Sequence, residues 1–101
     1  MSRDPLRDVV DAPLFIVPRV LERLRALRPA LDGAALAEFE RLRGCLLEGI
    51  ERHPTRFWVL KQVQKALQAV EGEDLETRRR FGAALKELLA IIGTDDGGVI
   101  P

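Results

Sequence analysis

Apolar residues recur at every third or fourth position in four stretches of this chain, and this spacing constrains the fold more than any other feature. Residues spaced in this way share one side of an α-helix, so each stretch predicts an amphipathic helix with a buried face. The four faces are expected to contain Val17, Val20, Leu21, Leu24 and Leu27; Leu36, Phe39, Leu42, Leu46 and Ile50; Val59, Leu60, Val63, Ala66, Leu67 and Val70; and Phe81, Leu85, Leu88, Leu89 and Ile92.

Proline, glycine and capping residues separate these four stretches. The first helix is expected to begin near Pro18, because proline suits a first helical turn, and to stop at Pro29. The second is expected to open at Asp32-Gly33 and to continue through residue 52, where His53-Pro54 ends it. Gly44 and Gly49 lie inside this helix and could allow another helix to approach closely, or mark a kink.

The last two helices have clearer signals at their ends. Thr55 is a good N-cap for the third helix, and Gly72 is expected to close it as a C-terminal glycine. The fourth helix is expected to start near Asp74 and to end before Gly93. Residues 94–98 are then expected to form a loop, and residues 99–101 are expected to form a short apolar tail.

The N-terminal residues 1–13 are polar with scattered apolar positions. Asp4 and Pro5 could begin a short extra helix that Pro13 ends, docked loosely on the rest. The apolar run 14–17 is interpreted as a buried lead-in to the next helix, since a single strand without a partner is not stable.

The length of 101 residues suits one domain, and the 47% apolar and 32% charged composition is typical of a globular chain. The connections between expected helices are short, so consecutive helices should be near-antiparallel neighbours. We therefore predict an all-α, four-helix bundle-like single domain.

Charge and hydropathy argue against two classes of partner. The 16 basic and 16 acidic side chains give a net charge of zero, whereas nucleic-acid binding usually needs a basic excess. The N-terminus lacks the apolar region of a signal peptide, and no apolar run approaches the length that spans a bilayer. With Cys45 as the one cysteine, an intramolecular disulfide is impossible, so we expect a cytoplasmic protein without nucleic-acid or membrane partners.

The sequence offers no recognisable catalytic or metal-binding set. The one histidine, His53, is not expected to have a nucleophile within reach, because the one serine is Ser2, close to the N-terminus. One cysteine and one histidine cannot build a standard zinc site, and Cys45 is expected to be a buried thiol. Residues 95–98 lack the ligand spacing of a calcium loop. No catalytic, metal or cofactor residue is therefore predicted.

A partner-binding surface is the remaining candidate site. Trp58 lies on the opposite side of its helix from the apolar face, and Trp is enriched at binding hot spots. The alternative is that the lead-in segment or the C-terminal tail covers it. The Arg78–Arg80 run is the densest basic stretch, although a solvated helix face would look the same. The candidate partner-binding residues are Trp58, Gln62, Lys65, Arg78 and Arg79.

Three stretches carry a resemblance to a known family: His53-Pro54-Thr55 and the helix that follows to Leu67, Leu75-Glu76-Thr77, and Leu88 to Gly93 with the acidic Gly-Gly tail. Over residues 45–100 the chain resembles the domain of unknown function 4844 family, small helical bacterial proteins. It departs in being rich in Arg and Ala and in lacking the usual Asn after the glycines. The resemblance implies an all-helical fold and carries no activity, cofactor or site residue.

Three functions remain open. The first is a non-enzymatic protein that acts through protein–protein binding, of which an immunity- or antitoxin-like protein is one specific form. The second is a homodimeric structural protein that associates through its second or third helix. The third is an enzyme with a carboxylate–arginine site built from Glu73, Glu76 and the Arg78–Arg80 run.

Overall fold

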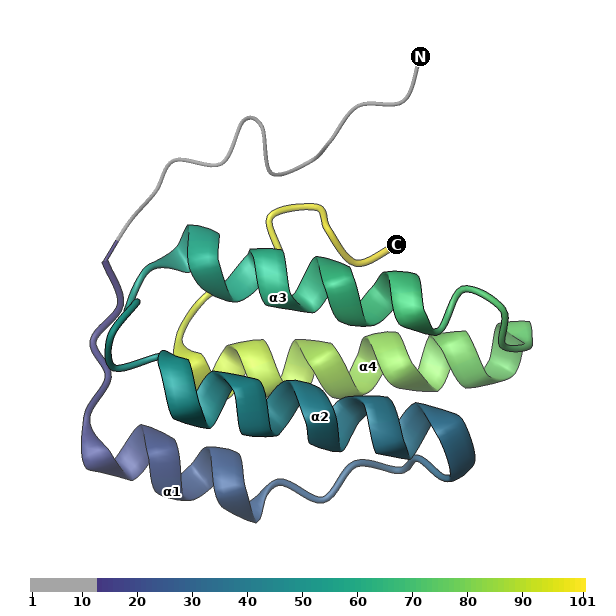
Figure 1. The fold of residues 1–101 in the computed structure, drawn as a ribbon, viewed down its shortest axis with the longest axis horizontal. Helices are drawn as coiled ribbons and strands as arrows, with labels where there is room; N and C mark the ends of the chain where they lie inside the picture. The colour runs from purple at the N-terminus through teal and green to yellow at the C-terminus, as the bar shows by residue number, and fades with distance from the viewer. Residues whose placement is uncertain (1–12) are drawn as a thin grey trace.

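Four α-helices form the part of the chain that the computed structural model describes, residues 13–101 (Figure 1). They are α1 (Pro18–Ala26), α2 (Gly33–Gly49), α3 (Arg56–Ala69) and α4 (Leu75–Ile92). Between residues 13 and 101 there is no strand, only an isolated antiparallel bridge between Pro13 and Thr55. The all-α, four-helix prediction is confirmed. The short helix expected within residues 1–13 falls almost wholly outside the described residues.

Side-chain caps and a left-handed glycine set several helix ends. The Trp58 N–H donates to Thr55 Oγ1 at 3.3 Å, and the Thr77 N–H donates to the Asp74 carboxylate at 2.7 Å, so α3 and α4 both begin where the sequence predicts. The hydrogen bond from Thr77 lowers the pKa of the Asp74 carboxyl group. Gly93 follows α4 with a φ of 96°, the conformation expected of a C-terminal glycine.

Other helix ends differ from expectation. The structure ends α1 at Ala26 rather than at Pro29, and α2 at Gly49 rather than at residue 52. Helix α3 ends at Ala69, and Gly72 does not adopt a left-handed φ, so its predicted capping role is wrong. The N–H groups of Val70 and Glu71 instead bond the carbonyls three residues earlier, which satisfies the end of α3 without a left-handed residue.

The buried side chains of α2, α3 and α4 follow the predicted periodicity, whereas in α1 only Leu24 is buried and the prediction of a buried Val17 is wrong. Every helix contributes to one core, and the C-terminal tail joins it. The largest fully buried side chains are Leu24, Phe39, Leu42, Leu46, Ile50, Val59, Leu60, Val63, Phe81, Leu85, Leu88 and Leu89. A core of this make-up fits the scarcity of aromatic residues in the sequence, since aliphatic side chains fill most of it.

The buried Arg43 joins α1 to α2. Its Nη1 donates to the Arg25 carbonyl at 2.9 Å, which satisfies a carbonyl in the last turn of α1. Its Nη2 lies 3.0 Å from a Glu40 carboxylate oxygen, and its guanidinium lies 5.2 Å from the centre of the Phe39 ring. The charge is thus paired with Glu40 and lies beside an aromatic ring where it leaves water, although Nε and Nη2 make no hydrogen bond.

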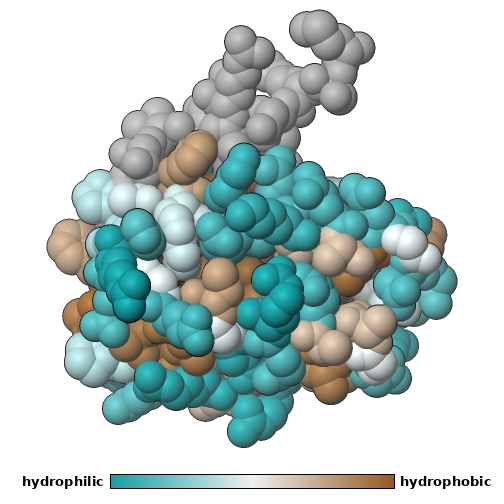
Figure 2. Space-filling view, viewed as in Figure 1, coloured by the Kyte–Doolittle hydropathy of each residue, from teal (hydrophilic) through white to brown (hydrophobic). Residues whose placement is uncertain are grey.

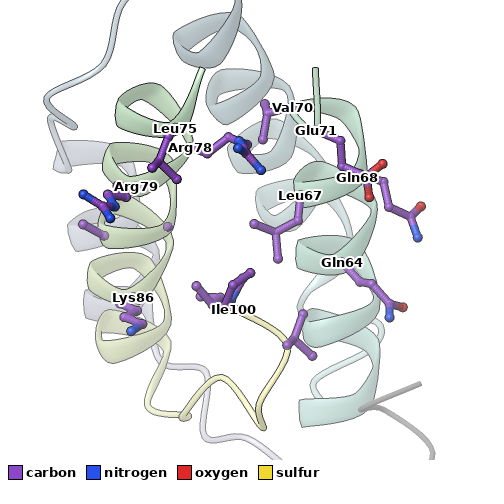
Figure 3. A pocket seen from close by; sticks show the side chains of 14 residues that line it. Gln64, Leu67, Gln68, Val70, Glu71, Leu75, Arg78, Arg79, Lys86 and Ile100 are labelled. Carbon is purple, nitrogen blue, oxygen red and sulfur yellow. The ribbon is translucent and has the colours of Figure 1, made fainter. Parts of the chain in front are cut away.

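Helices α3 and α4 hardly approach each other, although a short connection joins them. Helix α2 packs against α1, α3 and α4, and α1 packs against α4. The expectation that consecutive helices are neighbours holds for α1 with α2 and for α2 with α3, and it is wrong for α3 with α4. The tail supplies the reason, because Ile100 lies between the two helices (Figure 3).

Polar contacts fix the loop that leads to this tail. Arg56 on α3 forms an ion pair with Asp95, and the Gly97 N–H donates to the same carboxylate at 3.0 Å. The Arg56 hydrogen bond and the Gly97 N–H hold the pKa of the Asp95 carboxyl group below its ordinary value. Gly97 and Gly98 have φ values of 56° and 81°, a turn that glycine permits, and it directs Val99 and Ile100 into buried positions.

The outer surface is mainly hydrophilic on the face shown in Figure 2, with hydrophobic patches scattered between the polar groups. Among the described residues, the large hydrophobic side chains with notable exposure are Phe15, Val17, Phe57 and Leu75. The expectation that residues 14–17 form a buried lead-in is therefore wrong for Phe15 and Val17. Within residues 13–101, no helix combines the length and the apolar character needed to cross a membrane.

Candidate functional site

A groove of about 520 Å³ lies between α3 and α4, with the C-terminal tail at its base (Figure 3). Its volume falls in the range of sites that bind small molecules or a few side chains of a partner. Residues of three segments surround it: Gln64, Leu67, Gln68, Val70 and Glu71 from α3 and its end; Leu75, Arg78, Arg79, Gly82, Ala83 and Lys86 from α4; and Val99, Ile100 and Pro101 from the tail.

Small residues in the middle of α4 help to keep this groove open. Gly82 is buried against the tail, and a Cβ at that position would lie 3.3 Å from Cγ2 of Ile100. Ala83 is exposed beside it on the α4 wall. The absence of a side chain at Gly82 therefore lets the tail lie close to α4, and the short side chain of Ala83 leaves space on the α4 wall.

Apolar groups form the inner part of the groove. Leu67 points from α3 into the groove, opposite α4, and Ile100 lies between the two walls (Figure 3). Leu75, at the start of α4, is 54% exposed where it lines the groove. Leu75 therefore continues the apolar surface of the groove out to an exposed side chain.

The charged groups around the groove are unevenly distributed. Arg78, Arg79 and Lys86 line it from α4, whereas Glu71 is the one acidic side chain among the described lining residues. Arg78 extends from α4 across the groove, while Arg79 and Lys86 lie along the α4 side (Figure 3). The α4 wall is therefore cationic, and the α3 wall is mostly neutral, with the amides of Gln64 and Gln68.

The structure divides the predicted binding residues between different surfaces. Arg78 and Arg79 line the groove, but Trp58, Gln62 and Lys65 do not. Gln62 lies on the side of α3 that faces α2, where its Oε1 is 3.7 Å from the Cys45 thiol. Lys65 is exposed on α3. Two of the five predicted binding residues therefore line the groove.

Trp58 is half-buried by contacts within the chain. Its ring stacks on His53 with 5.4 Å between ring centres, and it lies so close to Gly49 that a Cβ there would be 2.6 Å from the ring. His53 and the close glycine of α2 supply these contacts. Trp58 keeps part of its surface accessible, so its proposed role in binding stays a prediction. Cys45, expected to be buried, is also half-buried.

The side chains of the predicted carboxylate–arginine site do not converge on this groove. Neither Glu73 nor Glu76 lines it. Glu76 instead pairs with Arg80 at 3.1 Å on the exposed surface, one helical turn apart. In the described part of the chain, no three His, Cys, Asp or Glu side chains are grouped closely enough to hold a metal ion.

The sequence pattern did not predict the groove. Periodicity assigns Gly82 and Ala83 no role, and the two glutamines of α3 look like ordinary solvated residues. Two signals in the sequence point toward the groove. One is the Gly-Ala pair within α4, and the other is the apolar Val99-Ile100 that follows the glycine turn.

Comparisons with known proteins identify no relative. No family model matches this chain, and no curated protein or solved structure is significantly similar to it. The resemblance to the domain of unknown function 4844 family therefore stays a prediction.

Proposed function

We propose that this protein is a non-enzymatic binding protein whose groove between α3 and α4 receives a segment of a partner protein. The single observation that carries the proposal is the groove itself: an apolar concavity of about 520 Å³ with the half-exposed Leu75 beside it. Apolar surface that stays open to water gains free energy when a partner covers it.

A helical segment of the partner fits this groove best. The lining residues of α4 run from Leu75 to Lys86, which corresponds to about 16 Å along a helix. A helix that docks in a groove presents apolar side chains at positions i, i+3 or i+4 and i+7, over about 10 Å. Such a segment would lie within the length of the α4 wall and contact Leu67 and Ile100 on its apolar side.

The other functional hypotheses stand in different relations to this groove. An immunity- or antitoxin-like role is one form of partner binding and would use the same surface. Self-association would place a segment of a second copy in the groove. Membership of the domain of unknown function 4844 family would add no activity to any of these.

Filling the groove tests the proposal. A tagged full-length chain is used to capture partners from a lysate of its own organism, together with Ala83→Arg, which places a long side chain in the groove. Ala37→Arg makes the same change at an exposed position of α2 that does not line the groove. We expect a stoichiometric partner to be lost with Ala83→Arg and retained with Ala37→Arg, while circular dichroism shows that both variants fold.

Equal capture by Ala83→Arg and the unchanged chain would refute the groove as the interface. Trp58→Ala tests whether the partner binds the surface around Trp58 instead of the groove. Loss of the partner with Trp58→Ala alone would move the interface to the surface around Trp58, where the sequence first suggested it.

A further inference from the structure

The charges around the groove between α3 and α4 specify what kind of partner segment it accepts. We infer that the groove binds an acidic amphipathic helix, whose apolar face lies on Leu67 and Ile100 and whose carboxylates face Arg78, Arg79 and Lys86 of α4. This inference rests on the proposed function and deepens it by naming the chemistry of the partner.

The arginines of α4 differ in whether the chain neutralises them. Arg80 pairs with Glu76, and elsewhere Arg56 pairs with Asp95 and Arg41 with Glu38. In the described residues, Arg78, Arg79 and Lys86 take part in no ion pair, although Arg78 lies close enough to Asp74 to lower the pKa of that carboxyl group slightly further. The cations beside the groove are therefore free to pair with carboxylates of a partner.

The position of Arg78 makes this pairing specific to the groove. Its side chain extends across the groove beside the apolar surface, so a carboxylate that meets it would lie next to the docked apolar side chains (Figure 3). Charge complementarity of this kind accelerates encounter and disfavours partners of the wrong sign. A basic helix with the same apolar face would bring like charges together and bind more weakly.

Helix α1 of a second copy of this chain is a poor occupant by the same argument. This helix carries exposed Arg19, Arg23 and Arg25, with Glu22 as its one acidic residue. Placing this helix in the groove would set arginines against the cationic α4 wall. The complementary partner is instead a protein segment with an acidic flank.

Two synthetic helices test the inference directly. Both are amphipathic peptides of about 18 residues, long enough to form helix on binding, with the same leucine face. One carries glutamate beside that face and the other carries lysine at the same positions. Binding to the full-length protein is measured by fluorescence anisotropy of labelled peptide. We expect the glutamate peptide to bind about tenfold more tightly, from a few partly exposed ion pairs, with affinity that falls as salt is added.

Charge reversal in the protein supplies the matched control. Arg78→Glu should abolish or invert the preference for the glutamate peptide, and Arg78→Lys should keep it. Arg23→Glu makes the same charge change at an exposed position of α1 and should leave the preference unchanged. Thermal unfolding of each variant confirms that the fold is retained.

The outcomes separate this inference from the proposed function. Equal binding of both peptides, blocked by Ala83→Arg, would overturn the acidic preference and keep the groove as a protein-binding site. No binding of the glutamate peptide at millimolar concentration would overturn the inference. Tighter binding of the fatty acid laurate than of the glutamate peptide, lost in Ala83→Arg, would overturn both in favour of a small anionic amphiphile.

Discussion

At the scale of single residues, two glycines of one helix have opposite roles. Gly44 and Gly49 both lie in α2, but a Cβ at Gly44 meets nothing within 4 Å, whereas a Cβ at Gly49 would lie 2.6 Å from the Trp58 ring. The sequence identified both as sites of close approach or a kink. Only the position of Trp58, which depends on the packing of α3 against α2, distinguishes them.

This difference predicts opposite effects of one substitution. Gly44→Ala should stabilise the protein by about 0.5–1 kcal/mol, because alanine favours the helix interior and meets open space. Gly49→Ala should destabilise it by about 1 kcal/mol or more, because the half-buried Trp58 ring must shift and the helix-end position offers little gain. Urea denaturation of both variants measures the free energy of unfolding. Stabilisation by Gly49→Ala would show that Trp58 moves freely and is not held against α2.

At the scale of helices, local signals predicted where the elements lie and where α3 and α4 begin. Periodicity and the caps at Thr55 and Asp74 are properties of adjacent residues, so a sequence contains them. The end of α3 was not predictable in this way. The turn after Ala69 closes through backbone hydrogen bonds spaced three residues apart, which leave no mark on residue type, and the presence of Gly72 pointed to a different ending.

The cap of α3 can be tested directly. Thr55→Ala removes the oxygen that accepts the Trp58 N–H and should lower the free energy of unfolding by about 1 kcal/mol. Thr55→Ser keeps the acceptor and should remain within a few tenths of a kcal/mol of the unchanged chain. Chemical denaturation compares the two variants. A loss of the same size for both would mean that the threonine methyl group, and not the cap, carries the contribution.

At the scale of the whole molecule, the groove exists because α3 and α4 diverge around the tail. Arg78 and Arg79 were predicted as binding residues from their charge, which is a local property. The apolar surface of the groove beside them was not predicted. It depends on the tail, whose Val99 and Ile100 are buried and whose Ile100 lies beside Gly82. Short connections favour adjacent helices in a bundle, and an apolar segment between two of them removes that constraint.

The tail therefore holds α3 and α4 in their present positions, and weakening its contacts should destabilise both helices. Ile100 is 6% exposed, so Ile100→Ala should cost about 2 kcal/mol or more, through lost burial and the cavity left between the helices. Amide hydrogen exchange should rise at the facing residues of both helices, and least in α1, which does not line the groove. Ile91→Ala offers a comparison, since Ile91 is half-buried and lies outside the groove. If Ile100→Ala left both stability and exchange unchanged, the tail would be a passive cover, and the separation of α3 and α4 would have to arise from their packing on α2 alone.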